Sequence, residues 1–384
     1  MKPLCSSLIA HFEKLEDPRV VGRTAHRLLD IIVITVCAVI SGAESWPDVA
    51  LYATQKEAFL RRFLSLPNGT PSHDTFRRVF TLIRPEQIQC CFVEWARSLM
   101  TGEDREVIAI DGKTIRRSFD RKKGQHPLHM VSAWATDAGL VLGQEACDEK
   151  SNEITAIPKL LDLLDLEGKI VTTDAMGCQK TIAQKVRAGG GDYVFGLKGN
   201  QQNMHDGAQA IFTEARRRRW RGYEYDRCET TEKGHGRKER RKYWTIRKRP
   251  VYDDICWIWG KEPWPDLNIV GVVESERTER GRTSKEVRYY LSSMANDAKA
   301  FARAVRGHWS VENNLHWVLD VVFREDDDRN RSGFAQNNLA AIRRLALNLL
   351  KQETKHKGSL KGKRKRAGWN DDYLLEVLGI EGKF

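Results

Sequence analysis

The chain has 384 residues, 41% of them hydrophobic and 30% charged, a composition that excludes a disordered chain and a single small domain. Its formal net charge of +12 indicates an anionic partner. The positive charge is concentrated: residues 214–249 contain 15 Lys/Arg and 6 Asp/Glu, and residues 351–366 contain 8 Lys/Arg and 1 Asp/Glu. Clustered cations of this kind are typical of nucleic-acid binding, because they displace counterions from phosphates.

The eight cysteines form no C-x-x-C pair and no zinc-like spacing with histidine, which favours a reduced, cytoplasmic protein. The most apolar run, Leu28–Ile40, contains Asp30 and is shorter than the roughly 20 residues that span a bilayer. We therefore expect a buried core helix there and no membrane partner. A DNA-binding protein of this kind would be associated with the nucleoid.

Residues 1–100 show helical spacing of apolar residues and predict a helical N-terminal domain, broken by Pro-Asn-Gly at 67–69. After this break, Ser72 is a candidate N-cap for a short helix that carries Arg77 and Arg78. Such a helix could enter a DNA groove, and an ordinary surface helix is the competing interpretation.

The hydrophobic pattern of residues 101–200 differs from that of the helical N-terminal domain. Apolar runs predict strands at 107–110, 130–135, 140–143, 170–173 and 193–197, and helical stretches fall near 154–164 and 178–188. Three strands joined by short turns, followed by strand–helix alternation, predict a mixed α/β sheet.

Residues 201–294 begin with a basic helix and continue with short alternating runs, which predict a β-rich basic insertion. Within it, Trp257 and Trp259 would share one face of a strand, either in a small β core or stacked on a base displaced from a duplex end. Residues 295–350 return to helix. Residues 351–384 predict a basic C-terminal tail, with a flexible linker at 361–366 before a last helix at 371–379.

Two aspartates close predicted strands: Asp111 follows Val-Ile-Ala-Ile, and Asp174 follows Ile-Val-Thr-Thr. Strand ends form ligand sites in open α/β sheets, and two close carboxylates resist joint ionisation unless a cation lies between them. Oxygen ligands suit Mg²⁺ or Mn²⁺. Structural interpretations remain, because Asp111 with Gly112 could form a hairpin turn and Asp174 could cap a helix.

A third carboxylate, Glu312, lies on a predicted helix with two stripes. The apolar stripe consists of Val311, Leu315, Val318 and Val322. The polar stripe, roughly 100° further round the helix, consists of His308, Glu312 and His316. A carboxylate flanked by imidazoles beside the packed face favours a functional site, and no Cys/His spacing elsewhere supports zinc.

The strings around these residues resemble those of a known protein family. Asp111-Gly112-Lys113, the strand ending in Asp174, and His-Trp-Ser-Val-Glu-Asn at 308–313 resemble the DDE insertion-sequence transposases. The resemblance is to the ISAs-type group, which includes the H-repeat-associated proteins linked to Rhs elements. The strings at 17–19, 45–46 and 71–75 are similar to the associated N-terminal domain of that group, so the resemblance covers most of the chain.

The resemblance implies an α/β fold with a ribonuclease-H-like mixed-sheet catalytic core, interrupted by the insertion. The first Asp lies on the central strand of that core, the second ends an adjacent strand, and the Glu lies on a late helix. It implies that Asp111, Asp174 and Glu312 hold two Mg²⁺ ions, which Mn²⁺ could replace. The implied activity is cleavage of DNA ends and strand transfer by in-line phosphodiester attack. The implied partners are double-stranded DNA, as terminal inverted repeats and target, and a second copy of the chain.

The sequence departs from the family pattern near Glu312. Where related transposases place Tyr and Arg before the Glu and Lys after it, this chain has Val305, His308 and Leu319. Arg306 and Arg324 are candidate replacements for the missing cations. Further candidates for phosphate contact are Lys113, Arg116 and Lys198, and a solvated surface cation is the alternative for each. Two other functions stay open: a metal-dependent nuclease that does not join strands, and an inactive DNA-binding relic of a mobile element.

Overall fold

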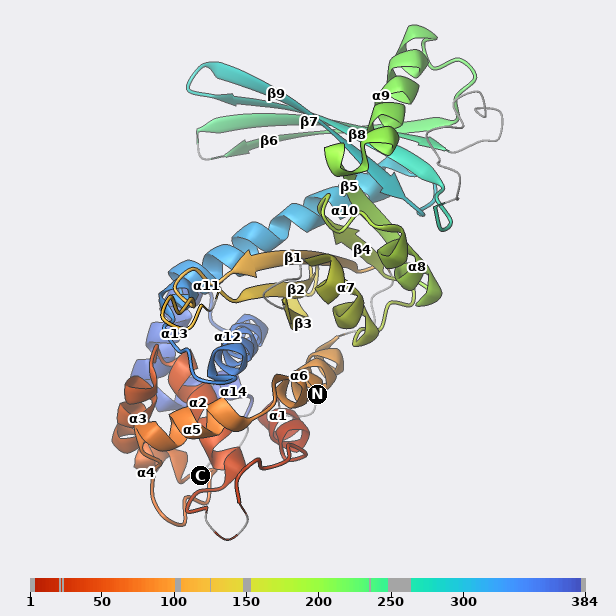
Figure 1. The fold of residues 1–384 in the computed structure, drawn as a ribbon. Helices are drawn as coiled ribbons and strands as arrows, with labels where there is room; N and C mark the ends of the chain where they lie inside the picture. Colours follow the sequence, from red (N-terminus) through yellow and green to blue (C-terminus); the bar gives the residue numbers. More distant parts are fainter. Residues whose placement is uncertain are drawn as a thin grey trace.

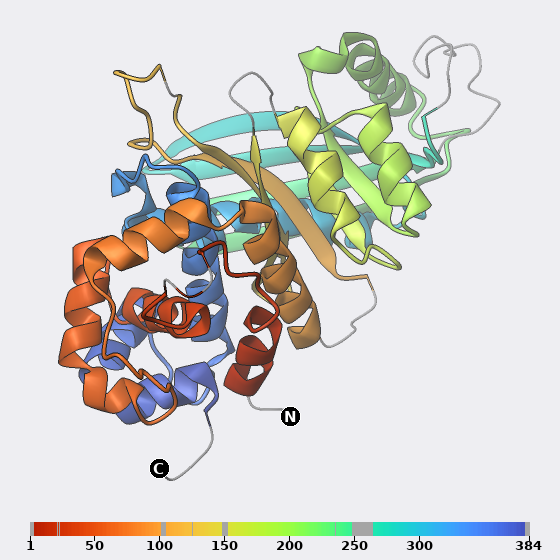
Figure 2. The same ribbon diagram turned by 60° about the horizontal axis from the view of Figure 1, so that its bottom comes forward.

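A helical body forms one end of the molecule and contains both ends of the chain (Figures 1 and 2). The computed structural model describes residues 4–20, 22, 24–100, 105–124, 126–147, 153–234, 236–247 and 264–380. The N-terminal part of the body consists of α1 (Leu4–Phe12), α2 (Leu28–Ile40), α3 (Trp46–Gln55), α4 (Glu57–Leu60), α5 (His73–Leu82) and α6 (Pro85–Leu99). The C-terminal part consists of α12 (Ala335–Gln352), α13 (Leu360–Trp369) and α14 (Asp371–Leu378).

The apolar run of α2 lies at the centre of this body. All of its residues except Leu29 are buried, and α12 packs along it, so that the two ends of the chain share one hydrophobic core. Burial raises the pKa of Asp30 above its usual value. The predicted core helix is therefore confirmed. None of the helices in the described ranges is long and apolar enough to cross a membrane.

The segment predicted as a flexible linker is instead helix α13, which is packed into the helical body. Ser359 caps its first turn, and the buried Arg364 donates hydrogen bonds to the carbonyl oxygens of Val39 and Val322. Lys363 donates to the carbonyl oxygen of Leu350 at 3.1 Å. Carbonyls at the ends of helices lack partners within the helix, and these cations supply them. The basic residues of the tail therefore contribute to the fold.

The central sheet begins with five strands that agree with the sequence prediction. They are β1 (Val107–Thr114), β2 (His129–Ala135), β3 (Leu140–Cys147), β4 (Ile170–Thr173) and β5 (Asp192–Leu197), with helices α7 (Glu153–Asp162) and α8 (Lys180–Ala188). Their order is β3-β2-β1-β4-β5. The first three strands are antiparallel neighbours, and β1, β4 and β5 are parallel. This mixed α/β sheet has the ribonuclease-H-like arrangement that the resemblance implied.

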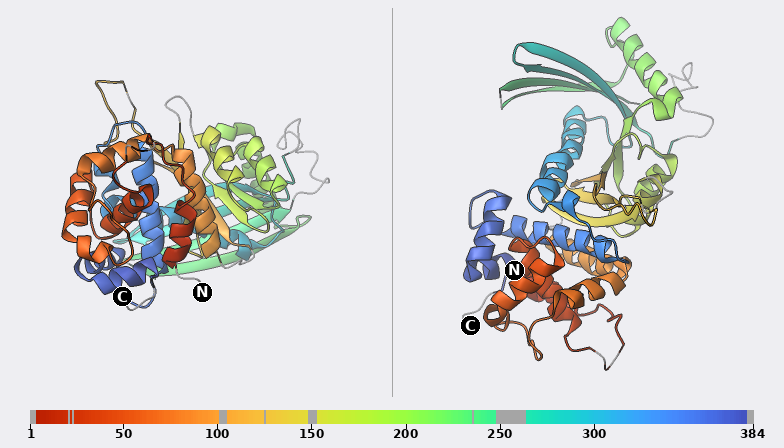
Figure 3. Two further views of the ribbon diagram at one scale, coloured as in Figure 1. Left: turned by 90° about the horizontal axis from the view of Figure 1, so that it is seen from below. Right: turned by 60° about the vertical axis from the view of Figure 1, so that its left-hand side comes forward.

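The β-rich insertion extends the same sheet. After α9 (Gln202–Arg217), strands β6 (Tyr225–Gly234), β7 (Arg237–Arg247), β8 (Ile269–Glu279) and β9 (Arg282–Ser292) follow. Strand β9 pairs antiparallel with β5, which gives nine continuous strands in the order β3-β2-β1-β4-β5-β9-β8-β7-β6. The insertion strands lie at the end of the molecule opposite the helical body (Figure 3, right).

The two faces of the sheet are covered by different helices. Residues 108 and 110 of β1 pack with α7 and α8 in one core, whereas Val107 packs with α10 (Ala298–Val311) in another. Helix α10 runs along its face from the insertion toward the helical body (Figure 1). Because side chains alternate along a strand, Asp111 of β1 belongs to the same face as Val107, the face that α10 covers.

Candidate active site

Two of the predicted carboxylates are brought together by strand register. Ile110 of β1 pairs with Thr173 of β4 in parallel orientation, so Asp111 and Asp174 occupy the next positions on the two strands. Asp111 lies within β1, opposite Ser132 of β2, and is mostly buried. The hairpin-turn interpretation of Asp111 and Gly112 is therefore wrong, because both residues are part of the central strand.

Asp174 begins the loop after β4. Its Oδ1 accepts backbone hydrogen bonds from Met176 at 2.8 Å and Gly177 at 3.3 Å. One carboxylate oxygen therefore orders this loop, and the half-buried side chain keeps a second oxygen for another ligand. The capping interpretation is wrong, because the N-cap residue of α8 is Gln179. His308 of α10 lies next to Asp174, with Nδ1 3.1 Å from Thr172 Oγ1. Burial lowers the pKa of His308 to about 4, against the opposing charge of Asp174.

Glu312 lies where α10 passes into a widened turn. Residues Glu312–His316 form one π-helical turn, and α11 (Trp317–Val321) continues from it. The predicted apolar stripe is buried throughout. The polar stripe is not uniform, because His308 and His316 are buried whereas the Glu312 side chain is 58% exposed. A π turn inserts an extra residue into a helix and is frequent at functional sites, and it breaks the regular 3.6-residue spacing on which the predicted stripes relied.

This turn carries Glu312 and His316 to Asp111. His316 Nδ1 is 3.6 Å from Asp111 Oδ2 and 3.7 Å from Glu312 Oε2. One ligand atom from each of these three residues lies within 4.8 Å of the other two. Burial, together with the charges of Arg344 and Lys113, lowers the pKa of His316 to about 4. The imidazole is therefore neutral at pH 7.

The environment of Asp111 disfavours its charged form. Burial raises its pKa to about 7, and the negative charges of Glu153, Glu312 and Asp174 act in the same direction. All the carboxylates of the site therefore interact electrostatically with Asp111. A divalent cation would offset this repulsion, because it adds positive charge where desolvated carboxylates converge.

Two further residues of the site, Glu153 and His129, were not predicted from the sequence. Glu153, the first residue of α7, accepts a hydrogen bond at 2.9 Å if His129 Nε2 carries a proton. A Cβ atom on Gly112 would lie 2.2 Å from Glu153 Oε1 and 2.3 Å from His129 Nε2, so a larger residue beside Asp111 would displace these two side chains. No motif marks Glu153 in the sequence. The only available signal was its place at the start of a helical stretch between the two aspartate strands.

Asp111→Asn should stabilise the cation-free protein near pH 8. Folding raises the pKa of Asp111 from 3.8 to about 7, so ionisation of this group costs stability as the pH rises from about 4 through 7. Three pKa units correspond to about 4 kcal/mol at most, and we expect about 2–4 kcal/mol. Urea unfolding with a chelator should show this gain near pH 8 and almost none near pH 4. Equal effects at both pH values would contradict the assigned environment.

The Lys and Arg residues predicted to contact phosphate differ in their surroundings. Lys113 is buried among Asp320 at 2.6 Å, Asp326 at 3.0 Å and Glu325 at 3.5 Å, a position that serves the loop after α11 and does not fit phosphate contact. Arg116 is 81% exposed and contacts Asp326. The exposed Lys198 lines a surface pocket together with Asp174.

The other residues predicted to contact DNA pair with acidic side chains, are exposed on α5 or lie outside the described residues. Arg306 pairs with Glu232 at 3.0 Å, and Arg324 pairs with Asp327 at 2.9 Å and with Glu44 at 3.4 Å. Arg77 and Arg78 are exposed on α5, where Arg77 pairs with Asp74 on the same helix. Two predicted residues, Trp257 and Trp259, lie outside the described residues. The two apolar replacements in the family pattern, Val305 and Leu319, are buried.

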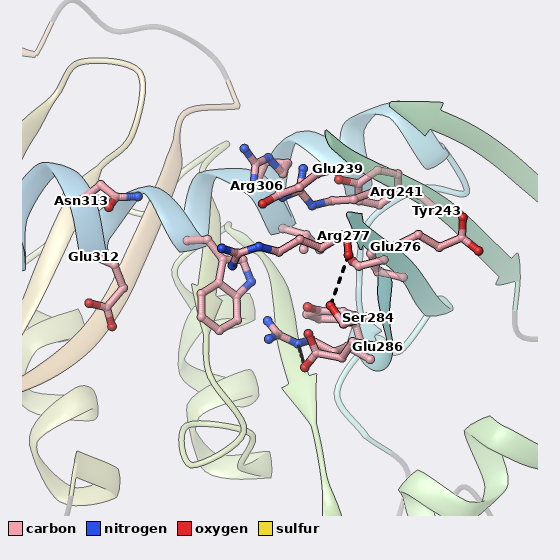
Figure 4. A pocket seen from close by; sticks show the side chains of 16 residues that line it. Glu239, Arg241, Tyr243, Glu276, Arg277, Ser284, Glu286, Arg306, Glu312 and Asn313 are labelled. Atoms are coloured by element: carbon pink, nitrogen blue, oxygen red, sulfur yellow. Dashed lines mark hydrogen bonds and ion pairs between the residues drawn. The ribbon is translucent and has the colours of Figure 1, made fainter. Parts of the chain in front are cut away.

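A groove of about 400 Å³ leads from the insertion to Glu312 (Figure 4). Strands β7, β8 and β9 form one wall and α10 forms the other. Its polar lining includes Arg241, Arg277 and Arg306. Near the Glu312 end, the Arg288 guanidinium lies 4.2 Å from the ring centroid of Trp309. Glu312 and Asn313 are therefore reached along a charged channel.

The mixed sheet has one carboxylate within β1, a second directly after the adjacent parallel strand β4 and a third on a late helix, which is the arrangement that the resemblance to DDE transposases implied. Sequence comparison agrees. The family model described as "Transposase DDE domain" matches residues 102–349, and the model "DDE_Tnp_1-associated" matches residues 9–96. The chain therefore belongs to the family of DDE transposases.

The chain also resembles individual proteins over most of its length. The "H repeat-associated putative transposase YhhI" of Escherichia coli is 40% identical over 98% of this chain and 98% of its own length. The "Uncharacterized protein in dhlA 3'region" of Xanthobacter autotrophicus is 43% identical over 74% of this chain and 94% of its own length. The solved piggyBac transposase synaptic complex with hairpin DNA is 10% identical, with a TM-score of 0.42 over 98% of this chain and 78% of that chain.

Proposed function

We propose that this transposase cleaves the ends of its insertion sequence and joins them to target DNA, with Asp111, Asp174 and Glu312 as the catalytic carboxylates. The observation that carries the proposal is their convergence. Asp111 and Asp174 are next in register on two adjacent parallel strands. Glu312 comes from a helix much later in the chain, and its charge acts on Asp111. Nothing in the packing of the sheet requires three carboxylates at one place.

The residues fit divalent cations. Oxygen ligands suit Mg²⁺, and Mn²⁺ is its usual substitute. Asp111, Asp174 and Glu312 would hold two such ions, whose positive charge would offset the burial and the neighbouring carboxylates that raise the pKa of Asp111. When bound, two divalent ions lower the pKa of an attacking water or DNA 3′-hydroxyl and stabilise the leaving oxygen of an in-line displacement.

Exposed residues of the site would contact the DNA. The exposed Glu312 side chain lies at the surface, where a phosphodiester backbone reaches it without opening of the fold. Two exposed cations would bind phosphates: Lys198, which lines a pocket together with Asp174, and Arg116, which follows β1. We infer that double-stranded DNA, as terminal inverted repeats and as target, is the partner, and that two copies of the chain act together on it.

Cleavage of DNA that carries the ends of the element tests this proposal. With Mg²⁺ or Mn²⁺, we expect a nick that leaves a 3′-hydroxyl at the element end. With a chelator, cleavage should fall below detection while DNA binding continues, since binding relies on side-chain cations. Binding without cleavage in Mg²⁺ would instead favour an inactive DNA-binding relic.

A further inference from the structure

We propose that His316 is a direct ligand of the divalent ion held by Asp111 and Glu312, so that the site contains an imidazole nitrogen as well as carboxylate oxygens. This inference deepens the proposed function and rests on it, because it presupposes the cation site. It adds a ligand to the three carboxylates that the family resemblance implies.

The distances fit shared coordination better than a hydrogen bond. His316 Nδ1 lies 3.6 Å from Asp111 Oδ2 and 3.7 Å from Glu312 Oε2, whereas N–H···O hydrogen bonds are about 2.7–3.2 Å long. With metal–ligand bonds of about 2.0–2.2 Å, two ligands of one ion lie roughly 3–3.5 Å apart. Small side-chain adjustments would therefore bring all three atoms onto a single ion.

His316 is buried, and its Nδ1 faces two carboxylate groups. The residue is 6% exposed. Its Nδ1 makes the two contacts given above, both longer than a hydrogen bond. A buried nitrogen without a close partner costs free energy, and a cation bound between Nδ1 and the two carboxylate oxygens would supply that partner.

The fold holds the ring in this place. The π turn brings Glu312 and His316 to one side, while Leu315 in the same turn is fully buried in the core of the helical body. His316 is therefore fixed by packing, as expected for a residue that holds a ligand in position. An imidazole suits Mn²⁺ better than Mg²⁺, which favours oxygen, so this site should bind Mn²⁺ more tightly than Mg²⁺.

Pulsed electron paramagnetic resonance of the full-length protein with Mn²⁺ and without DNA tests the assignment. We expect a nitrogen-14 coupling of a directly bound imidazole, which changes to the nitrogen-15 pattern after labelling of histidine. The coupling should vanish in His316→Gln, and the Mn²⁺ dissociation constant should rise about tenfold or more. His308→Gln is the matched control, because His308 lies on the same helical segment and its Nδ1 contacts Thr172; this variant should keep the coupling.

The outcomes separate the two proposals. Mn²⁺ binding that is lost in Asp111→Asn but shows no nitrogen coupling in the wild-type protein would overturn the role of His316 and leave the carboxylate site intact. Coupling that persists in His316→Gln would also overturn it. Absence of Mn²⁺ binding would overturn the cation site and with it both proposals. Even if His316→Gln does not fold, absence of the nitrogen coupling from the wild-type spectrum would overturn the role of His316.

Discussion

Asp111→Asn, Asp174→Asn and Glu312→Gln are each expected to lower metal-dependent DNA cleavage by at least about a thousandfold. Each substitution keeps the size and shape of the side chain but removes the charge that holds a cation. DNA binding should stay within about twofold of the wild-type affinity, because it depends on Lys and Arg contacts with phosphates. Single-turnover cleavage and a gel-shift titration measure the two quantities separately.

Asp162→Asn is the matched control for this series. Asp162 ends α7, is 62% exposed and pairs with Lys185, so its amide variant removes a carboxylate without touching the site. Cleavage by this variant should equal that of the wild-type protein. If any of the three site variants retained cleavage near the wild-type rate, the catalytic assignment of that residue would be wrong.

Deletion of residues 360–384 is expected to unfold the helical body. The deletion removes α13 and α14, whose Leu374, Val377 and Leu378 are fully buried against the N-terminal helices. Loss of one buried Leu side chain costs about 2–5 kcal/mol, so loss of both helices should cost more than about 5 kcal/mol, a large part of the stability of a typical domain. Thermal unfolding of the purified chain, or its failure to remain in solution, measures this effect. A stable, soluble deletion variant would contradict the structural role of α13 and α14.

The double variant Lys361→Gln and Lys365→Gln separates charge from packing in the same helix. Both side chains are exposed, so the melting temperature should be unchanged. If these lysines bind DNA phosphates, the salt dependence of binding should become shallower, by about 0.9 in log–log slope for each lysine that pairs with a phosphate.

The site could be predicted where local patterns carry the information. Asp111 and Asp174 follow short apolar runs, which mark the two strands. Strand β4 ends just before Asp174 as predicted, whereas β1 continues through Asp111 to Thr114. The stripe beside Glu312 is likewise local, because apolar residues at helical spacing identify the buried face. These elements lie at their predicted positions, within a few residues at their ends.

Features that depend on contacts between distant segments could not be predicted. The pairing of β9 with β5 makes the insertion part of the core sheet, and no local pattern distinguishes an added strand from a separate layer. Lys113 is a candidate phosphate ligand by sequence, but in the structure α11 and the segment after it surround this lysine with three carboxylates. The basic composition of α13 predicts a flexible linker. The segment is helical and packed instead, because its Lys and Arg side chains bind carbonyl oxygens of other helices.

Strand joining is the step that distinguishes a transposase from a nuclease, and a single assay measures it. The protein is incubated with Mg²⁺, a labelled duplex that ends in the terminal repeat of the element, and a supercoiled target plasmid. We expect labelled plasmid in which the 3′ end of the repeat is covalently joined to target DNA, and no such product with Glu312→Gln. Efficient cleavage of the labelled duplex with no joined product would contradict strand transfer and show a metal-dependent nuclease instead.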